Sequence, residues 1–280
     1  MGIGQLYQQR LEQLKIATTR VDPNPDRSAD YQNVADALTR QYLTAHICTP
    51  NHTHESIADQ IADHASIVFI EKPGVQTADN WQQLVNRHPC TRFMMVKNNQ
   101  YRDNIEQMQQ LYLYSSKVRV HWINRDRVPS PGTWFTNREL AFGGVSRDLL
   151  PHLLSLYTLL EPEYASTVWT TQLAEQRWQL KDLTATDYGT VNPNGVYNVD
   201  DRVELIGHIG SRELSFVADW RSDQEEDIAI YFDDVRIPLG LCPDRAYGRM
   251  IQTAIDNYEN DEFWQQQLAM DLWIQRTIEL

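Results

Sequence analysis

A largely apolar run at residues 65–70, broken only by Ser66, constrains the fold of this chain more than any other feature. Strands with continuous apolar sequence are buried on both faces, which is typical of parallel sheets covered by helices. Glu71-Lys72-Pro73 follows the run directly. Ligands of open parallel sheets bind just beyond the carboxyl ends of the strands. The run therefore predicts an α/β fold with Lys72 at the ligand-binding edge, although an isolated lysine after a strand is more often a solvated charge.

The two halves of the chain carry different strand patterns. In the first half, short apolar runs alternate with helical patterns, as in βαβ units whose right-handed crossovers place all strands in one parallel sheet. From residue 168 the runs alternate between apolar and polar residues, which predicts an antiparallel sheet, with a hairpin turn at Gly210-Ser211. We therefore predict two domains, at residues 1–115 and 116–280. The predicted strands are 15–21, 45–49, 66–70, 91–96, 168–173, 203–209, 213–220, 228–232 and 235–239, and the predicted helices are 5–14, 34–41, 52–64, 78–87, 102–114, 148–160, 245–258 and 262–278.

The start of the chain carries a partial dinucleotide-binding pattern. Gly2 and Gly4 lead into a predicted helix beginning at Gln5, and Asp22 follows about twenty residues later. In such folds a glycine turn brings the pyrophosphate to a helix N-terminus, and the acidic residue binds the ribose hydroxyls of NAD. Tyr7 stands where a further glycine is expected, and the strand that should precede the turn is missing. For the glycines taken alone, a flexible tail is the alternative.

The missing first strand matters because that strand is central in a doubly wound sheet. Without it, two neighbouring strands would expose backbone groups, each costing about 1–3 kcal/mol if buried unpaired. We therefore expect that the chain is truncated, or its start codon misplaced, relative to an ancestral protein. An in-frame apolar strand ending in Gly in the upstream DNA would support this expectation, and a stop codon just before Met1 would contradict a misplaced start.

Three short motifs follow one another along the chain. They are Thr49-Pro50-Asn51 with His54, then Glu71-Lys72-Pro73, and then Gly143-Gly144 followed by Asp148 and His152. Together they resemble the motifs of the glucose–fructose oxidoreductase / inositol dehydrogenase / rhizopine catabolism (Gfo/Idh/MocA) family, in that family's order and approximate spacing. The likeness covers roughly residues 1–160 by motif.

The resemblance implies an N-terminal Rossmann-like parallel sheet lacking its first strand and a C-terminal α/β domain with a mostly antiparallel, open sheet. It also implies a nicotinamide cofactor and a sugar, cyclitol or related polyol as substrate. Lys72 would be the catalytic lysine, with Asp148 and His152 as its partners. The expected cofactor-binding residues are Gly2, Gly4, Gln5, Asp22, Thr49, Pro50, Asn51, His54, Glu71, Lys72 and Asn99. Asp22 favours NAD, because a carboxylate there repels a 2′-phosphate, and NADP stays the alternative.

The chemistry of alcohol oxidation explains why these residue types are needed. The cofactor takes the hydride, and the protein must handle the proton. Asp148 and His152 are four apart in a predicted helix, so both side chains leave the same face. Either His152 or Lys72 could take the proton, and a basic Lys72 would need its pKa lowered from about 10.4 towards about 7–8. The alternative is a helix-starting Asp and a core His bonded to backbone. Pro73 is expected to hold its turn, through a cis bond to Lys72.

Composition and charge limit the kinds of ligand and partner that the chain is expected to bind. The 280 residues are 41% hydrophobic, and no apolar run approaches membrane-spanning length. The net charge of −13 argues against nucleic acid, whose binding needs clustered Lys and Arg. Cys48, Cys90 and Cys242 are an odd set without metal spacing, which fits a reduced cytoplasm. His52 and His54 lack a third ligand, so no metal is expected. Since the family commonly associates through its open sheet face, we expect a homodimer or homotetramer.

Two other functions remain open from the sequence. The missing strand suggests a nicotinamide-binding sensor or regulatory protein without turnover. A hydrolase on the same fold, using bound NAD for transient oxidation during glycoside cleavage, would release free sugar without net NADH. An NAD-dependent oxidoreductase is the leading prediction, because Lys72, Asp148 and His152 are all present.

Overall fold

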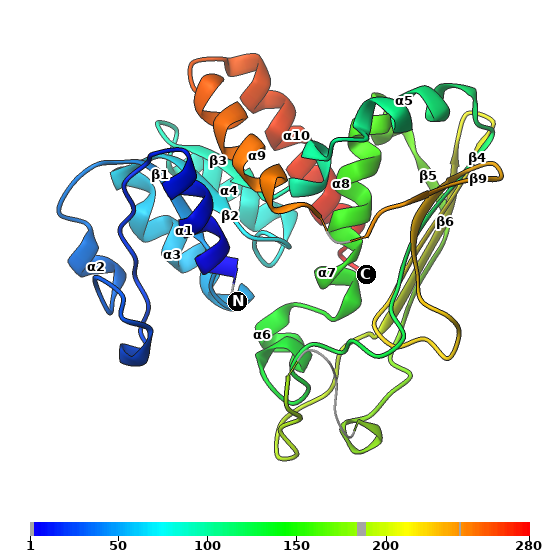
Figure 1. Cartoon of the computed structure of the whole chain (residues 1–280), viewed down its shortest axis with the longest axis horizontal. Coiled ribbons are helices and arrows are strands. Elements are labelled where there is room, and N and C mark those ends of the chain that lie inside the picture. Colours follow the sequence, from blue (N-terminus) through cyan, green and yellow to red (C-terminus); the bar gives the residue numbers. More distant parts are fainter. Residues whose placement is uncertain (1–2, 184–188, 241) are drawn as a thin grey trace. The chain divides into compact units, whose positions relative to one another are not determined.

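The computed structural model describes residues 3–183, 189–240 and 242–280 (Figure 1). Contacts between residues divide the chain into two compact units. Unit 1 comprises the described residues up to Asn98 together with Pro243–Leu272. Unit 2 comprises the described residues of Asn99–Cys242 together with Trp273–Leu280. The domain boundary at residue 115 stays a prediction.

Unit 1 contains a three-stranded parallel sheet, as the pattern of the first half predicts. The strands are β1 (Tyr42–Ile47), β2 (Ala65–Ile70) and β3 (Arg92–Met95), in the order β1-β2-β3. β2 is central and, apart from the half-buried Ser66, buried, which explains its largely apolar sequence. Ile47 is aligned with Ile70, and Ile70 with Met95, so the three carboxyl ends lie at one edge of the sheet.

Helices connect these strands and complete unit 1. The helix between β2 and β3 has the predicted bounds, because the Thr77 hydroxyl caps it by accepting a hydrogen bond from the backbone N–H of Asn80. Its apolar face buries Trp81 and Leu84 completely. The helices are α1 (Ile3–Gln13), α2 (Val34–Ala37), α3 (His54–Ile61), α4 (Ala78–Arg87), α9 (Asp244–Asp256) and α10 (Asp261–Thr277, in this unit as far as Leu272).

The strand predicted at residues 15–21 is wrong. Lys15 has a φ of 59° in the turn that ends α1, and of the residues that follow only Val21 forms a bridge, to Tyr31. A strand pattern becomes a strand only where a neighbour can pair with its backbone. Here the carbonyl of Arg20 accepts instead from the backbone N–H groups of Asp30 and Tyr31, in the loop that follows.

Unit 2 contains a mixed, mostly antiparallel sheet of six strands. Only the β4–β7 pair is parallel among its five described pairings, and the strand order is β5-β6-β7-β4-β8-β9. The strands are β4 (Lys117–Ile123), β5 (Val168–Glu175), β6 (Arg202–Ile209), β7 (Arg212–Asp219), β8 (Asp227–Phe232) and β9 (Val235–Pro238). The helices are α5 (Ile105–Tyr114), α6 (Arg138–Ala141), α7 (Val145–Asp148) and α8 (Leu150–Leu160), and α8 packs on β4 and β7.

β4 was not predicted, although it lies between β7 and β8 in this sheet. Its sequence alternates, with Val118, Val120 and Trp122 buried between more exposed residues, which is the ordinary signal of a half-buried strand. The hairpin predicted between β6 and β7 is confirmed. Ile209 pairs with Arg212, and Gly210 has a φ of 55° in the two-residue turn between them.

The two sheets confirm the predicted fold class, a Rossmann-like parallel sheet followed by a mostly antiparallel one. Among the residues described, no helix combines the length and the apolar sequence that crossing a membrane requires.

Candidate functional site

The Glu71-Lys72-Pro73 turn lies at the carboxyl edge of the unit 1 sheet, directly after β2. The backbone N–H of Glu71 donates to the carbonyl of Ile47 at 3.0 Å, and that of Gly74 donates to the carbonyl of Glu71 at 3.0 Å. The peptide bond between Lys72 and Pro73 is cis, as expected from the sequence. The hydrogen bond from Glu71 to Ile47 ties the backbone of this turn to the end of β1. The Lys72 side chain is half-buried.

Tyr7 supports the same turn from α1. Its hydroxyl donates a hydrogen bond of 3.0 Å to Oε1 of Glu71, and both side chains are buried. Burial and the neighbouring Glu71 charge raise the pKa of Tyr7, so the hydroxyl keeps its proton and acts as donor. The Tyr7 ring packs on His46 with centroids 4.7 Å apart, and His46 stacks on Phe69 at 4.7 Å. An aromatic residue therefore fills the position at which the sequence pattern led us to expect a glycine.

His54 joins the loops that follow β1 and β2. The side chain is completely buried, with Nδ1 2.7 Å from the carbonyl oxygen of Gly74 and Nε2 2.8 Å from that of Thr49. Burial lowers the pKa of His54, and the two carbonyls oppose this effect. Both ring nitrogens face backbone carbonyl oxygens, and a neutral imidazole donates its one N–H to one of the two. A cofactor contact for His54 stays a prediction.

The Thr49-Pro50-Asn51 loop follows β1 at the same edge of the sheet. The hydroxyls of Thr49 and Thr53 lie 2.6 Å apart, and the Thr53 hydroxyl also donates to the carbonyl of Pro50 at 2.7 Å. Thr49, Pro50 and Asn51 are all half-buried. The structure thus brings this predicted loop and the lysine turn to neighbouring strand ends.

Two adjacent amides follow β3. Oδ1 of Asn98 and Nδ2 of Asn99 are buried without a hydrogen-bond partner among the described residues, and Oδ1 of Asn99 accepts from Nε of Arg102 at 2.7 Å. A buried acceptor without a partner suits an external donor such as the carboxamide of nicotinamide. The residues at the strand ends of unit 1 therefore fit the nicotinamide half of a dinucleotide.

The residues expected to hold the rest of the dinucleotide are less well supported. Gly2 lies outside the described residues, and Gly4 and Gln5 are exposed at the start of α1. Asp22 does not end a strand; its Oδ1 accepts from the backbone N–H of Asn24 at 2.9 Å, within a loop. The roles of these four residues stay predictions.

In unit 2, Asp148 is the last residue of α7, and His152 lies in the first turn of α8. Nε1 of Trp220 donates to Oδ2 of Asp148 at 2.9 Å. The His152 ring stacks on Trp122, with centroids 5.7 Å apart and planes 28° apart. The helix predicted to run on from Asp148 is interrupted at Leu149. Asp148 ends α7, and His152 lies in the separate helix α8.

Asp200 fixes the start of α7 under the predicted Gly-Gly motif. Its two carboxylate oxygens accept from the backbone N–H groups of Gly144 at 2.9 Å and Ser146 at 2.8 Å. A Cβ on Gly144 would lie 1.7 Å from the carbonyl oxygen of Asp200, so only glycine fits there. Gly144 therefore allows the close approach of residues 199–200 to the start of α7.

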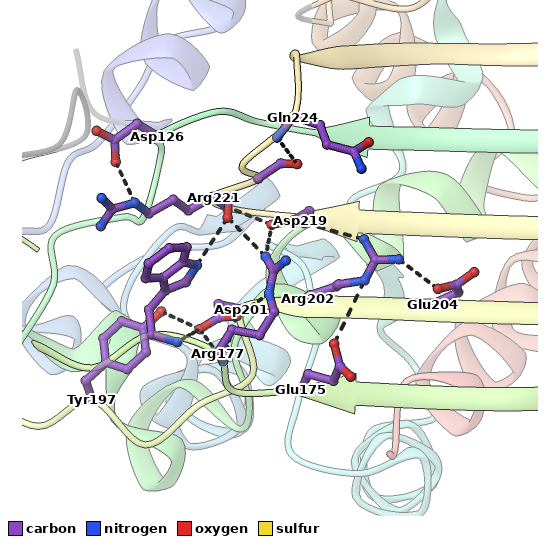
Figure 2. Close-up of polar contacts among 12 residues, drawn as sticks. Asp126, Glu175, Arg177, Tyr197, Asp201, Arg202, Glu204, Asp219, Arg221 and Gln224 are labelled. Carbon is purple, nitrogen blue, oxygen red and sulfur yellow. Dashed lines mark hydrogen bonds and ion pairs between the residues drawn. The ribbon is translucent and has the colours of Figure 1, made fainter. Parts of the chain in front are cut away.

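A buried charge network lies at the end of β7 (Figure 2). Asp201 and Asp219 are completely buried, and Arg177 bonds to both, with its Nη2 2.6 Å from Oδ1 of Asp219 and its Nε 3.3 Å from Oδ1 of Asp201. Burial raises the pKa of Asp219, and the Arg177 charge opposes that rise. Asp219 directly precedes Trp220, so this network lies next to the residue that bonds Asp148.

Tyr7, Trp122, Asp200 and Trp220 were missed as supports of the predicted site residues. Only Tyr7 carried a sequence signal, as the residue in place of a glycine. No group of three or more His, Cys, Asp or Glu side chains arranged to hold a metal is found in the described part of the chain.

Residues 4–94 match the GFO_IDH_MocA model, which describes an oxidoreductase family with an NAD-binding Rossmann fold. A protein of Amycolatopsis mediterranei (strain S699), assigned as a UDP-kanosamine synthase oxidoreductase subunit, is 26% identical over 231 residues. The alignment covers 75% of this chain and 62% of that relative, so the chain matches less than two thirds of the relative's length.

Solved structures share the fold of both units. GenD2 from gentamicin A biosynthesis, crystallised with NAD, has a TM-score of 0.70 at 16% identity and covers 99% of this chain and 91% of its own. Levoglucosan dehydrogenase with NADH and levoglucosan has a TM-score of 0.63 at 15% identity, covering 92% and 85%. A myo-inositol dehydrogenase from Corynebacterium glutamicum ATCC 13032 has a TM-score of 0.63 at 13% identity, covering 91% and 85%.

Proposed function

We propose that this chain is an NAD-dependent oxidoreductase that transfers a hydride between nicotinamide and a hydroxyl or ketone of a sugar, cyclitol or related polyol. The observation that carries the proposal is Lys72, which follows the central strand of a parallel sheet within the segment that matches an NAD-binding oxidoreductase family. Relatives support the substrate class, since they include a levoglucosan dehydrogenase, a myo-inositol dehydrogenase and a protein of gentamicin biosynthesis.

The proposed chemistry divides between cofactor and protein. The nicotinamide supplies or accepts the hydride when it is bound. Lys72 binds the reacting oxygen of the substrate, where its positive charge stabilises developing negative charge. His152 exchanges the proton of that oxygen, because an imidazole transfers protons efficiently near neutral pH. Asp148 holds His152 and the substrate hydroxyls in a fixed arrangement. Exchange of the roles of Lys72 and His152 remains the alternative within this mechanism.

The cofactor proposal assigns the nicotinamide side to Thr49, Pro50, Asn51, Glu71 and Asn98, which lie at neighbouring strand ends. The unpaired Oδ1 of Asn98 would accept from the nicotinamide carboxamide. Asp22 would favour NAD over NADP by repelling a 2′-phosphate.

Titration of the purified chain with NADH and NADPH, followed by tryptophan fluorescence, tests cofactor binding. NAD reduction is then measured with levoglucosan, myo-inositol and L-sorbose, with Lys72→Met as the inactive control. We expect NADH to bind more tightly than NADPH and at least one compound to be oxidised. Tight NADH binding without turnover on a wide polyol panel would favour a sensor over an enzyme, and no binding of either nucleotide would contradict the proposal.

A homodimer or homotetramer in the cytoplasm belongs to the same proposal. Exposed apolar side chains on strands of the unit 2 sheet support association, among them Val168, Leu173 and Ile206. Light scattering at micromolar concentration is the test, and a monomeric mass would contradict the assembly.

A further inference from the structure

Two tryptophans of unit 2 contact the two residues proposed to handle the proton. Trp220 donates its indole N–H to Oδ2 of Asp148 at 2.9 Å, and Trp122 stacks on the ring of His152. Trp220 is 1% exposed and Trp122 is 7% exposed, so both rings are fixed by packing. Neither tryptophan belongs to a motif of the sequence.

The sheet explains why both indoles reach the same pair of helices. β4 and β7 are neighbouring parallel strands, so their carboxyl ends meet at one edge. Trp122 is aligned with Ala218, and Trp220 lies two residues beyond Ala218. Side chains two residues apart leave the same face of a strand. The two rings therefore emerge together on the face that α7 and α8 cover.

The backbone around Trp220 is bonded on every side. Its N–H donates to the carbonyl of Asp201 at 3.0 Å, and its carbonyl accepts from the N–H of Arg127 at 2.9 Å. The next carbonyl, of Arg221, accepts from Nε1 of Trp178 at 3.1 Å and Nη2 of Arg177 at 3.0 Å. Figure 2 shows this network at the end of β7, with Arg177 between Asp201 and Asp219. Such support keeps the Trp220 indole in one position.

We infer that Trp220 and Trp122 are positioning residues of the acid–base pair, Trp220 fixing the carboxylate of Asp148 and Trp122 fixing the ring plane of His152. The inference rests on the proposed function, because it needs Asp148 and His152 to act in turnover. A donor on one carboxylate oxygen holds the group in a single orientation, and a stacked indole stops the imidazole from turning. Proton transfer depends steeply on such alignment, and an error near 1 Å can cost about 100-fold in rate.

The kinetic test compares Trp220→Phe with Trp169→Phe, using NAD and the substrate identified above. Trp220→Phe keeps a ring in the core but removes the N–H donor, and we expect kcat to fall about 10-fold to 100-fold. KM and NADH affinity should change less than about twofold, since the change affects only alignment. Trp169 packs edge-on against Phe216 and at a tilt against Trp273 in the same unit, so Trp169→Phe should retain wild-type kcat. Wild-type kcat in Trp220→Phe, with Asp148→Asn impaired, would overturn the inference.

A second measurement needs no substrate. The eight tryptophans give separate indole N–H signals in a ¹⁵N-labelled sample, and the signal lost in Trp220→Phe identifies that residue. Asp148→Asn should shift this signal and leave the other indole signals in place, which also shows that the variant is folded. Trp122→Leu should shift the His152 ring signal, because the ring current of the indole is lost. An unmoved Trp220 signal in Asp148→Asn would refute the contact.

The two measurements separate the two proposals. If the wild-type chain turns over no compound of the panel, the proposed function fails, while the indole and imidazole signals still decide whether the tryptophans hold Asp148 and His152. If turnover is found and Trp220→Phe keeps wild-type kcat while Asp148→Asn is impaired, the positioning role fails and the proposed function stands.

Discussion

The lysine turn of unit 1 and the proposed acid–base pair of unit 2, Asp148 and His152, are held by different kinds of contact. The turn is tied by backbone hydrogen bonds, such as the N–H of Glu71 to the carbonyl of Ile47, and by His54 between two carbonyls. Asp148 and His152 are instead held by the indoles of Trp220 and Trp122. Backbone support survives most side-chain changes, whereas side-chain support fails when one distant residue changes.

Buried charges show the same contrast. In unit 1, Lys97 and Asp271 form a single, completely buried ion pair, in which Asp271 also accepts from the backbone N–H of Met95. In unit 2, Asp201 and Asp219 share Arg177 and have further donors of their own. Without Asp271, Lys97 would keep the neutral carbonyl of Met95 as an acceptor but lose its carboxylate, whereas each aspartate of the network would keep a backbone donor without Arg177.

The largest expected effect is on turnover. Lys72→Met should lower kcat/KM by about 1,000-fold, because it removes the charged group proposed to bind the reacting oxygen. NADH affinity should change little, since β1, β2 and the loops after them are intact. Lys181→Met, which changes an exposed lysine of unit 2, is the matched control and should behave as wild type. If Lys72→Met keeps turnover within tenfold of wild type, Lys72 is not catalytic and the catalytic groups lie in unit 2 alone.

The parts of the fold with local signals were predicted well from the sequence. α4 was predicted with its observed bounds because Thr77 caps it and its apolar residues follow the helical period. β2 was nearly correct because a strand buried on both faces has continuous apolar sequence. The strand expected at residues 15–21 failed because pairing depends on a neighbour that local sequence does not reveal. β4 was missed although its alternation is plain.

For the candidate site, the sequence identified residues but not their supports. Lys72, Asp148 and His152 stand in motifs, so their positions could be compared with a family pattern. The bond from Tyr7 to Glu71 joins residues 64 apart, and the bond from Trp220 to Asp148 joins residues 72 apart. Contacts of this kind exist only after the sheets form, and no spacing in the sequence encodes them.

The next largest effect tests the contrast between a single pair and a network. Asp271→Ala leaves Lys97 buried without its partner, and we expect a loss of about 3–5 kcal/mol in the free energy of unfolding. Arg177→Ala should cost less, about 1–3 kcal/mol, because Asp201 keeps the Trp178 N–H and Asp219 keeps the Arg221 N–H. Hydrogen exchange of peptides from β3 and β7 measures each unit by itself.

Asp261→Ala is the control for this pair of variants. Asp261 is 75% exposed and pairs with Arg92, so its removal should cost less than about 1 kcal/mol. An Arg177→Ala variant as unstable as Asp271→Ala would show that the network offers no redundancy.

A smaller effect is expected where a side chain does support the lysine turn. Tyr7→Phe removes the hydroxyl that donates to Glu71, with an expected loss of about 2 kcal/mol in stability and about 10-fold in kcat. Tyr42→Phe is the matched control, because the Tyr42 hydroxyl donates to the carbonyl of Ala37, a residue of α2. Its loss should cost about 1 kcal/mol without lowering kcat. If Tyr7→Phe keeps wild-type kcat, backbone bonds alone suffice to hold the turn.

The smallest effect concerns acid stability of unit 1. Burial between Tyr7 and Phe69 lowers the pKa of His46 from 6.5 to about 3. Below about pH 6.5 the unfolded chain binds a proton at His46, whereas the folded chain binds it only near pH 3. The free energy of unfolding therefore falls as the pH falls from about 6.5 to about 3. Between pH 6.5 and pH 5.5 the loss should be about 1 kcal/mol. His46→Phe should remove this share of the pH dependence, measured by urea unfolding at both pH values. Equal slopes in His46→Phe and wild type would show that His46 accepts its proton while folded.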